Sequence, residues 1–262
     1  MPWLTDQPRQ RPTLLWMECG ACSGESMAIL GAGGSDTLPE FLDRHDVQLL
    51  WHPSLSPESP SEVAGVIDHI VAGEQHLTLL CVEGSIINGP GGTGLFDTFE
   101  GRPKRDVVAA LCHRAQYVLA MGSCAAFGGI PAAPPNPSES VGLQFTNARP
   151  GGLLDPGWRS RSGLPVVNLS GCPVDAATMI ETMGLLLQGQ RLDLNRYQQP
   201  ATVRPCLANA LEHKCATADK VGYVCYGCIS ARFPVNRALF RHHPVATQTP
   251  VPSEPELQGA AP

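Results

Sequence analysis

At 262 residues the chain is long enough for one large domain with its own core, or for one domain and a small appendage. The net charge is −6 and no run of lysine or arginine occurs, which argues against nucleic acid and anionic membrane surfaces as partners. Charged residues make up only 16%, well below the usual quarter or so, so much of the surface is expected to be buried against a partner protein.

The N-terminal extension, residues 1–12, shows no targeting signal. It has neither an apolar core nor a twin-arginine pair, and no apolar stretch elsewhere approaches the roughly 20 residues that span a bilayer. We therefore expect a cytoplasmic protein without a transmembrane segment, at most peripheral to a membrane through its partners. In a reducing cytosol, clustered cysteines bind metal more often than they form disulfides, and the chain has ten of them.

Short apolar runs alternate with segments whose apolar residues recur at helical spacing. The runs are continuously hydrophobic, which is typical of parallel strands covered on both faces. This alternation predicts an α/β fold, a doubly wound parallel sheet, over residues 13–198. The expected strands are 14–17, 47–51, 77–82, 117–121 and 165–169, and expected helices include 61–73, 105–115 and 176–188.

Cysteines follow three of the five predicted strands. In doubly wound sheets, ligands bind beyond the carboxyl ends of the strands, so these thiols are expected at one edge. The pair in the first loop, taken alone, fits zinc, a cluster or a redox disulfide. Four thiolates at matching strand ends favour a [4Fe–4S] cube, and the glycines beside them let the backbone approach it closely. The four are Cys19, Cys22, Cys124 and Cys172.

Two carboxylates and two further cysteines lie in or near the same strands. Glu18 and Glu83 stand at strand ends, where they would tune the potential of a cluster or relay protons; a carboxylate bonded to backbone N–H groups is an equal alternative. Cys81 and Cys112 fall inside a predicted strand and a predicted helix. Because free cysteine is a common core residue, we expect these two to be structural.

The segment Gly89–Gly94 fits the Gly-x-Gly-x-x-Gly pattern of dinucleotide-binding loops. Such a loop should follow a strand directly and open a helix. Here Glu83–Asn88 intervene and Pro90 stiffens the chain, so we expect a shaped loop over the cluster edge and no nucleotide site.

The remaining cysteines gather in residues 199–243, where the strand–helix alternation ends. Four thiolates in a short, strand-poor segment indicate a metal-stapled module, for which a second [4Fe–4S] cluster is favoured and zinc is the alternative. His213 could replace one thiolate, although a surface histidine is the commoner explanation. Residues 244–262 are proline-rich and polar, as in a disordered tail. The four cysteines are Cys206, Cys215, Cys225 and Cys228.

With these cysteines placed, the sequence resembles the small subunit of [NiFe] hydrogenases, most closely the cytoplasmic uptake or sensor-type subunits. The matching pieces run in family order through residues 14–188. They are Leu15-Trp16-x-x-Cys19-x-x-Cys22-Ser23, Trp51-His52-Pro53-Ser54-Leu55, Glu83-Gly84-Ser85-Ile86-Ile87-Asn88, Gly122-Ser123-Cys124-Ala125, Pro135-Asn136-Pro137 and Gly171-Cys172-Pro173.

The resemblance implies a flavodoxin-like domain with a proximal [4Fe–4S] cluster on the four strand-end cysteines. It also implies a heterodimer, or a higher oligomer, with a large subunit that carries the Ni–Fe centre and the catalytic site. Electrons from H₂ oxidation would then pass through this chain to an acceptor protein or a quinone.

The C-terminal third departs from the family pattern. Larger members carry a medial and a distal cluster, whereas here only Cys225-x-x-Cys228 and Arg232-Phe233-Pro234 resemble the end of the medial piece. No Cys-x5-Cys occurs, so we expect two clusters in total.

Three alternatives stay open. A regulatory H₂ sensor would use the same core to signal to a partner. The quinone-reductase subunit of respiratory complex I shares this domain, but it has adjacent cysteines in its first loop. A structural zinc protein would contain zinc and no acid-labile sulfide.

Overall fold

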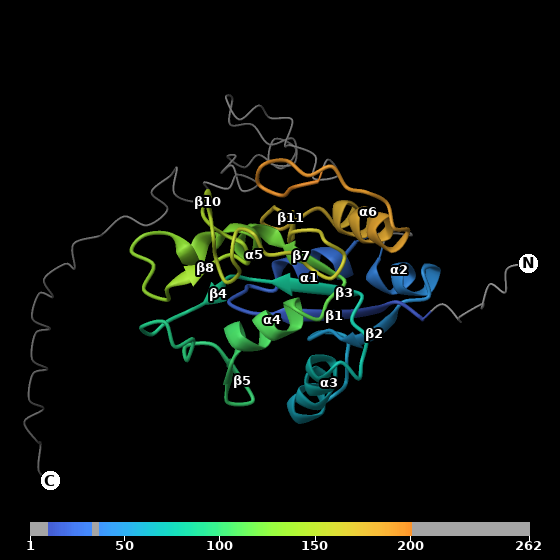
Figure 1. Ribbon diagram of the computed structural model, residues 1–262. Coiled ribbons are helices and arrows are strands. Elements are labelled where there is room, and N and C mark those ends of the chain that lie inside the picture. Colours follow the sequence, from blue (N-terminus) through green and yellow to red (C-terminus); the bar gives the residue numbers. More distant parts are fainter. Residues whose placement is uncertain (1–9, 33–36, 201–262) are drawn as a thin grey trace, which may run out of the picture.

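The computed structural model describes residues 10–32 and 37–200 (Figure 1). The predicted C-terminal module with Cys206, Cys215, Cys225 and Cys228, together with His213 and the tail, lies outside the described residues. The boundaries expected for that module and for the N-terminal extension therefore stay predictions.

The core of the fold is a parallel five-stranded sheet in the order β11-β7-β3-β1-β2. Counted along the chain among these five strands, this is the 2-1-3-4-5 order of flavodoxin-like folds, in which the strand order reverses between the first and third strands. All five predicted strands are confirmed within a few residues. They are β1 (Thr13–Glu18), β2 (Gln48–Trp51), β3 (Leu79–Glu83), β7 (Tyr117–Met121) and β11 (Val167–Leu169).

Helices cover both faces of the sheet, as a doubly wound fold requires. In Figure 1, α3 (Pro60–Ala72) and α4 (Lys104–Cys112) lie below the sheet, and α6 (Ala176–Leu187) lies above it. These three were predicted from helical spacing. Shorter helices that had not been specified are α1 (Gly24–Leu30), α2 (Leu38–Arg44), α5 (Gly122–Phe127) and the 3₁₀ turn η1 (Ile130–Ala132).

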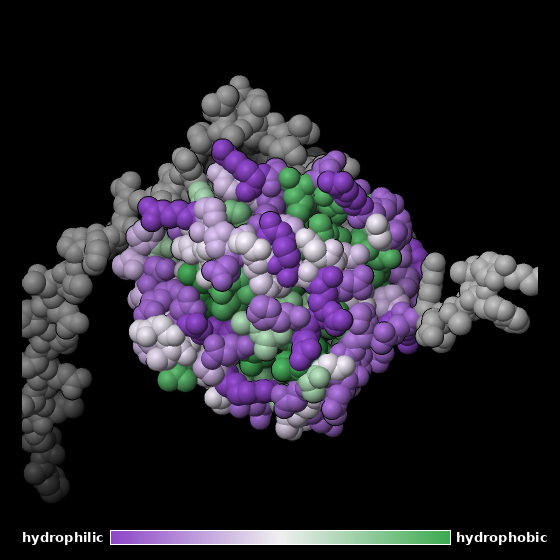
Figure 2. All heavy atoms as spheres, viewed as in Figure 1, coloured by the Kyte–Doolittle hydropathy of each residue, from purple (hydrophilic) through white to green (hydrophobic). Residues whose placement is uncertain are grey.

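Alternate residues of each strand enter two separate apolar layers. In β1, Leu15 and Met17 pack with the layer under α3 and α4, whereas Leu14 and Trp16 pack with the layer that contains α2 and α6. Because successive side chains of a strand point to opposite faces, a continuously apolar strand fills both layers at once. The surface shown in Figure 2 is correspondingly mostly hydrophilic, with apolar residues appearing between the polar ones.

Local sequence signals set the ends of α3. Ser59 accepts a hydrogen bond from the Glu62 N–H, and the Glu62 carboxylate accepts one from the Ser59 N–H, which forms a capping box. Pro60 occupies the first turn, where its missing N–H costs nothing, and Gly73 ends the helix in the left-handed conformation.

Three short antiparallel ribbons lie in the loops between the main elements, and each consists of two strands of two residues. They pair β4 (Ile86–Ile87) with β8 (Ser140–Val141), β5 (Thr98–Phe99) with β6 (Arg102–Pro103), and β9 (Phe145–Thr146) with β10 (Arg149–Pro150). No helix among residues 10–32 and 37–200 is long and apolar enough to cross a membrane.

Candidate functional site

The first cysteine loop leaves β1 at the point where the strand order reverses. The Cys19 N–H donates to the Glu83 carbonyl at 2.8 Å, and Gly20 and Ser85 exchange backbone hydrogen bonds of 3.0 and 3.1 Å. Up to Gly20, the loop is therefore hydrogen-bonded to the chain that follows β3. Cys19 is buried in this hydrogen-bonded part, and Cys22 is exposed just before the helix.

The other two cysteines come from the neighbouring strand ends. Cys124 lies in the first turn of α5, which starts directly after β7. Cys172 follows β11 and is exposed. The Ser123 N–H donates to the Gly171 carbonyl at 2.8 Å, and the Gly171 N–H donates to Ser123 Oγ at 3.1 Å. These two bonds fix the α5 start against the Cys172 loop.

Burial dominates the protonation of two of these thiols. Burial raises the pKa of Cys124 to about 12, with further contributions from neighbouring Cys172 and Cys22. Burial also raises the pKa of Cys19 to about 12, followed by the negative charge of Asp97. A buried thiol in this setting keeps its proton unless a bound cation replaces it, so metal binding here would release protons.

The donors at this edge are thiols. Among the described residues, no three His, Cys, Asp or Glu side chains converge closely enough to hold one metal ion. In a [4Fe–4S] cube each thiolate bonds a different iron, so the four ligands stand apart around the cluster. The four strand-end cysteines, none of them in a disulfide, fit a cube.

Glycines leave room for two of the sulfurs. A Cβ atom added to Gly129 would stand 2.5 Å from Cys124 Sγ, and one added to Gly24 would stand 3.2 Å from Cys22 Sγ. Gly129 also has a φ of +54°, which L side chains rarely adopt. Backbone without a side chain thus lies close to two of the four sulfurs, and its approach to a bound cluster stays a prediction.

Glu83 is held almost entirely by the start of α1. It is fully buried, and its carboxylate accepts hydrogen bonds from Trp16 Nε1 at 2.9 Å, from Ser26 Oγ at 2.6 Å and from the N–H groups of Glu25 and Ser26. These contacts match the alternative in which the carboxylate binds backbone N–H groups, and they tie β3 to the first cysteine loop. Glu18, half-buried, accepts a hydrogen bond from Ser23 Oγ.

Glu25 is a buried carboxylate that sequence reasoning missed. It is 7% exposed, and its carboxylate lies against Gly122, where any Cβ would collide with it. Burial, and next the nearby charge of Glu83, raises the pKa of Glu25 to about 8. The Glu25 carboxyl therefore mostly keeps its proton at pH 7. The only sequence signal was a second acidic residue, after Glu18, close to the Cys-x-x-Cys pair.

His52, in the Trp-His-Pro-Ser motif, is also buried beside this region. Its ring centroid lies 5.1 Å from that of Trp16, and its Nδ1 accepts a hydrogen bond from the Ser54 N–H at 3.1 Å. Burial lowers the pKa of His52 to about 4, so the ring is neutral at pH 7. Its Nε2 finds no hydrogen-bond partner among the described residues.

The glycine-rich loop does not have the form of a nucleotide site. It leads into the β5–β6 ribbon and opens no helix. The N–H groups of Gly91 and Gly92 donate to the two carboxylate oxygens of Glu139 at 2.7 and 2.9 Å, so the anion that they bind is a side chain of the same protein. The expectation of a shaped loop is confirmed. Cys81 and Cys112 are fully buried core residues, also as expected.

The family model described as "NADH ubiquinone oxidoreductase, 20 Kd subunit" matches residues 22–186, well over half of the chain. The chain belongs to this family. Among curated members, a small subunit of F420 non-reducing hydrogenase II from Methanosarcina mazei is 27% identical over 68% of this chain and 48% of its own length. The Hydrogenase-2 small chain of Escherichia coli K12 is 26% identical over 68% of this chain and 43% of its own length.

The chain thus spans about half the length of the curated relatives it matches. An actinobacterial-type NiFe-hydrogenase structure from Ralstonia eutropha H16 superposes with a TM-score of 0.69 at 25% identity, covering 90% of this chain and 83% of that one. A Ni-Fe-Se hydrogenase from Desulfomicrobium baculatum gives 0.68 at 20% identity, covering 88% and 98%. Hydrogenase small subunits are therefore distant homologues, and the uptake or sensor subtype stays a prediction.

Proposed function

We propose that this chain is the electron-transfer small subunit of a [NiFe] hydrogenase, and that its described domain holds a proximal [4Fe–4S] cluster. The observation that carries the proposal is the set of four thiols, none of them in a disulfide, that three strand ends deliver to one edge, at the point where the strand order reverses. Ligands of open α/β sheets bind at this point. The cluster ligands would be Cys19, Cys22, Cys124 and Cys172.

Such a cluster would supply one-electron transfer, and the protein would set its reduction potential through burial and hydrogen bonds. Cys19 and Cys124 are the more buried ligands, and Cys22 and Cys172 the more exposed ones. One side of the cluster would therefore face the protein interior and the other a partner. Glu25, whose pKa burial raises to about 8, would offset part of any change in charge beside the site by taking up or releasing a proton.

Apolar side chains left exposed support a protein partner on this edge. Met27 in α1 is 70% exposed, five residues after Cys22, and Ile130 directly follows the glycine that contacts Cys124. Leu95 and Phe96, in the loop fixed by Glu139, are 58% and 60% exposed. Large exposed apolar residues on a rigid frame are typical of interfaces. The proposed partner is a large subunit with the Ni–Fe centre, in a heterodimer or a higher oligomer.

The further path of the electrons is part of the same proposal. A second [4Fe–4S] cluster on the four C-terminal cysteines would pass electrons to an acceptor protein or a quinone. For the subtype we favour a cytoplasmic uptake enzyme, with an H₂ sensor as the alternative. Rapid H₂-dependent reduction of an artificial acceptor by the purified complex would support uptake, and very slow turnover would favour sensing.

The description of the family supports one other candidate, a subunit of NADH:ubiquinone oxidoreductase. A Cys-x-x-Cys pair in the first loop, in place of adjacent cysteines, and the hydrogenase relatives weigh against it. The two candidates differ in the electron source: H₂ reduces the clusters of a hydrogenase, whereas NADH reduces those of the quinone reductase through its own partners.

The decisive experiment is metal analysis of the chain co-purified anaerobically with its partners. We expect iron and acid-labile sulfide in equal amounts, an EPR signal of a reduced [4Fe–4S] cluster, and reduction of that cluster by H₂. Zinc without sulfide would contradict the proposal that the chain holds an iron–sulfur cluster. If the complex contains iron and sulfide and its cluster is reduced by NADH but not by H₂, the result would favour the quinone-reductase candidate.

A further inference from the structure

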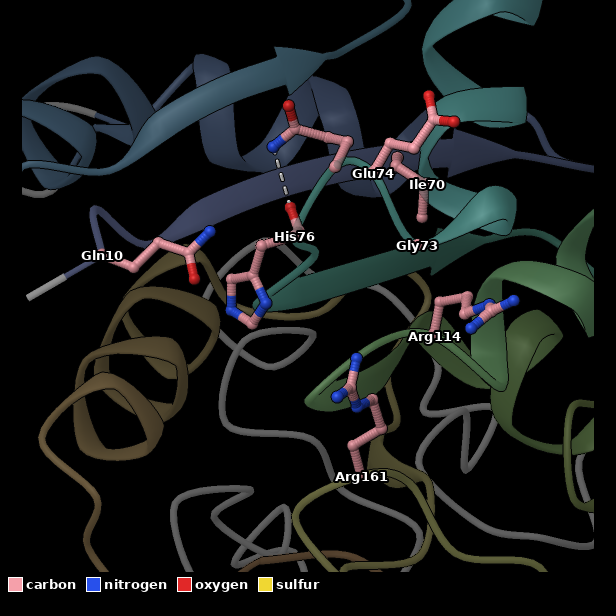
Figure 3. Close-up of a pocket in the computed structure, with 8 residues that line it drawn as sticks. Gln10, Ile70, Gly73, Glu74, His76, Arg114 and Arg161 are labelled. Atoms are coloured by element: carbon pink, nitrogen blue, oxygen red, sulfur yellow. Dashed lines mark hydrogen bonds between the residues drawn. The ribbon is translucent and has the colours of Figure 1, made fainter.

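A polar pocket lies at the end of the sheet opposite the cysteines. It has a volume of about 240 Å³, and its lining comes from segments that precede β1, β3, β7 and β11. Figure 3 shows the side chains of His76, Arg161 and Arg114 in the same opening, with Gly73 beside Arg114. We propose that this pocket is a binding site for a phosphate group, with the guanidinium groups of Arg114 and Arg161 as its principal donors.

The fold brings the two arginines together although they are far apart in the sequence. The Arg161 N–H donates to the Ala115 carbonyl at 3.2 Å, and the Ser162 N–H donates to the Gln116 carbonyl at 3.1 Å. The loop before β11 therefore runs along the turn that follows α4. This backbone pairing brings the loop that carries Arg161 beside the turn that carries Arg114, and both residues line the pocket.

Neither guanidinium has an acidic partner. Within residues 10–32 and 37–200, neither Arg114 nor Arg161 forms an ion pair, whereas Arg11, Arg102 and Arg105 each lie within 4.0 Å of an aspartate. Two positive charges that line one pocket without a counterion repel each other, and a bound anion offsets this repulsion. The charge pair also stands out on a chain whose net charge is −6.

The rest of the lining suits an oxyanion. Gly73 has no side chain, and even an added Cβ would stand only 3.5 Å from Arg114 Nη1, so this guanidinium lies against the bare turn that ends α3. Burial, and next the charge of Arg161, lowers the pKa of His76, which leaves a neutral ring able to donate one N–H. The one carboxylate in the lining, that of Glu74, lies 2.6 Å from His69 Nδ1.

The chemistry of the donors selects the ligand class. Arginine presents a planar fork of N–H groups that matches the oxygens of phosphate in a bidentate manner. A pocket of this volume is smaller than the roughly 300–1,000 Å³ of sites that enclose drug-sized ligands. It would hold the phosphate itself, either as the free ion or as the end of a nucleotide whose remainder stays outside.

The test is equilibrium dialysis of radiolabelled orthophosphate against the full chain in its native complex, at constant ionic strength in sodium chloride. We expect saturable binding of about one phosphate per chain, because both arginines line the same pocket. Arg114→Gln and Arg161→Gln should each weaken binding by at least about tenfold, since hydrogen bonds between charged groups are among the strongest. Arg149→Gln removes the same charge from an exposed arginine outside the pocket and should leave binding unchanged.

A parallel titration with ADP distinguishes the sources of the phosphate group. Equal affinities would identify free phosphate, and tighter binding of ADP that the two pocket variants also weaken would identify a nucleotide. All three arginines are exposed, so we expect the variants to fold, which thermal unfolding in chloride would verify. Non-saturable binding, no binding, or an equal loss in Arg149→Gln would overturn the proposal. None of these outcomes bears on the proposed cluster, whose iron and sulfide are measured separately.

Discussion

Gly129→Ala is the sharpest test of the cluster site, because a side chain at this position would collide with Cys124, one of the proposed ligands. The new Cβ would stand 2.5 Å from Cys124 Sγ and 2.8 Å from Cys124 Cα. Ordinary carbon contacts begin at about 3.5 Å, so the sulfur would have to move by about 1 Å. Metal–ligand distances tolerate deviations of only about 0.2 Å, so we expect Cys124 to be lost as a ligand.

The matched control is Gly163→Ala. Gly163 also has a positive φ, +84°, but an added Cβ there would meet no atom within 4 Å. Both variants should lose about 1–3 kcal/mol of folding free energy through backbone strain. Only Gly129→Ala should also lose the cluster.

The assay is the content of iron and acid-labile sulfide in the purified complex, with EPR of the reduced protein. We expect Gly129→Ala to lose about four irons per chain, the content of one cube, and its proximal signal. Gly163→Ala should keep both. Wild-type iron content and an unchanged signal in Gly129→Ala would refute the reasoning that glycine is needed to seat the Cys124 ligand.

Three further predictions follow from the same structure. Cys124→Ala should abolish the proximal EPR signal and electron flow. Cys112→Ala, in the core, should lower the free energy of unfolding by at most about 1–2 kcal/mol, measured by chemical denaturation. Equal behaviour of the two variants would contradict the assignment of Cys124 as a ligand. His52, with its pKa lowered to about 4, stays neutral in the folded state while the unfolded chain protonates near pH 6.5. The free energy of unfolding should therefore fall as the pH drops from 6.5 to 4, by at most about 3 kcal/mol, and His52→Asn should remove this slope; an unchanged slope would refute the assignment. Replacing any single C-terminal cysteine should remove about four irons per chain and leave the proximal EPR signal unchanged. A wild-type content of about twelve irons per chain, instead of about eight, would contradict the expectation of two clusters. The residues to replace are Cys206, Cys215, Cys225 and Cys228.

The sequence by itself determined the fold class and predicted which thiols lie at the carboxyl edge of the sheet. Continuously apolar runs such as Tyr117–Met121 can be satisfied only where both faces are covered, which requires a parallel sheet between helices. In such a sheet all carboxyl ends meet at one edge, so cysteines placed after the strands had to gather there. Neither inference needs any knowledge of side-chain contacts. Motif order then pointed to the hydrogenase small subunits, which the homologues support.

Only the tertiary structure decided how the side chains around that edge are used. Glu25 and Glu83 are 58 residues apart, and their pairing depends on α1 packing its start onto the end of β3. Glu139 fills the glycine-rich loop from 47 residues away. The meeting of Arg114 with Arg161 likewise depends on the path of the loop before β11. Hydrophobic periodicity records which residues are buried in each element, but it carries no information about which distant loops come together. Those contacts follow from strand order and loop path, and they exist only once the whole domain has packed.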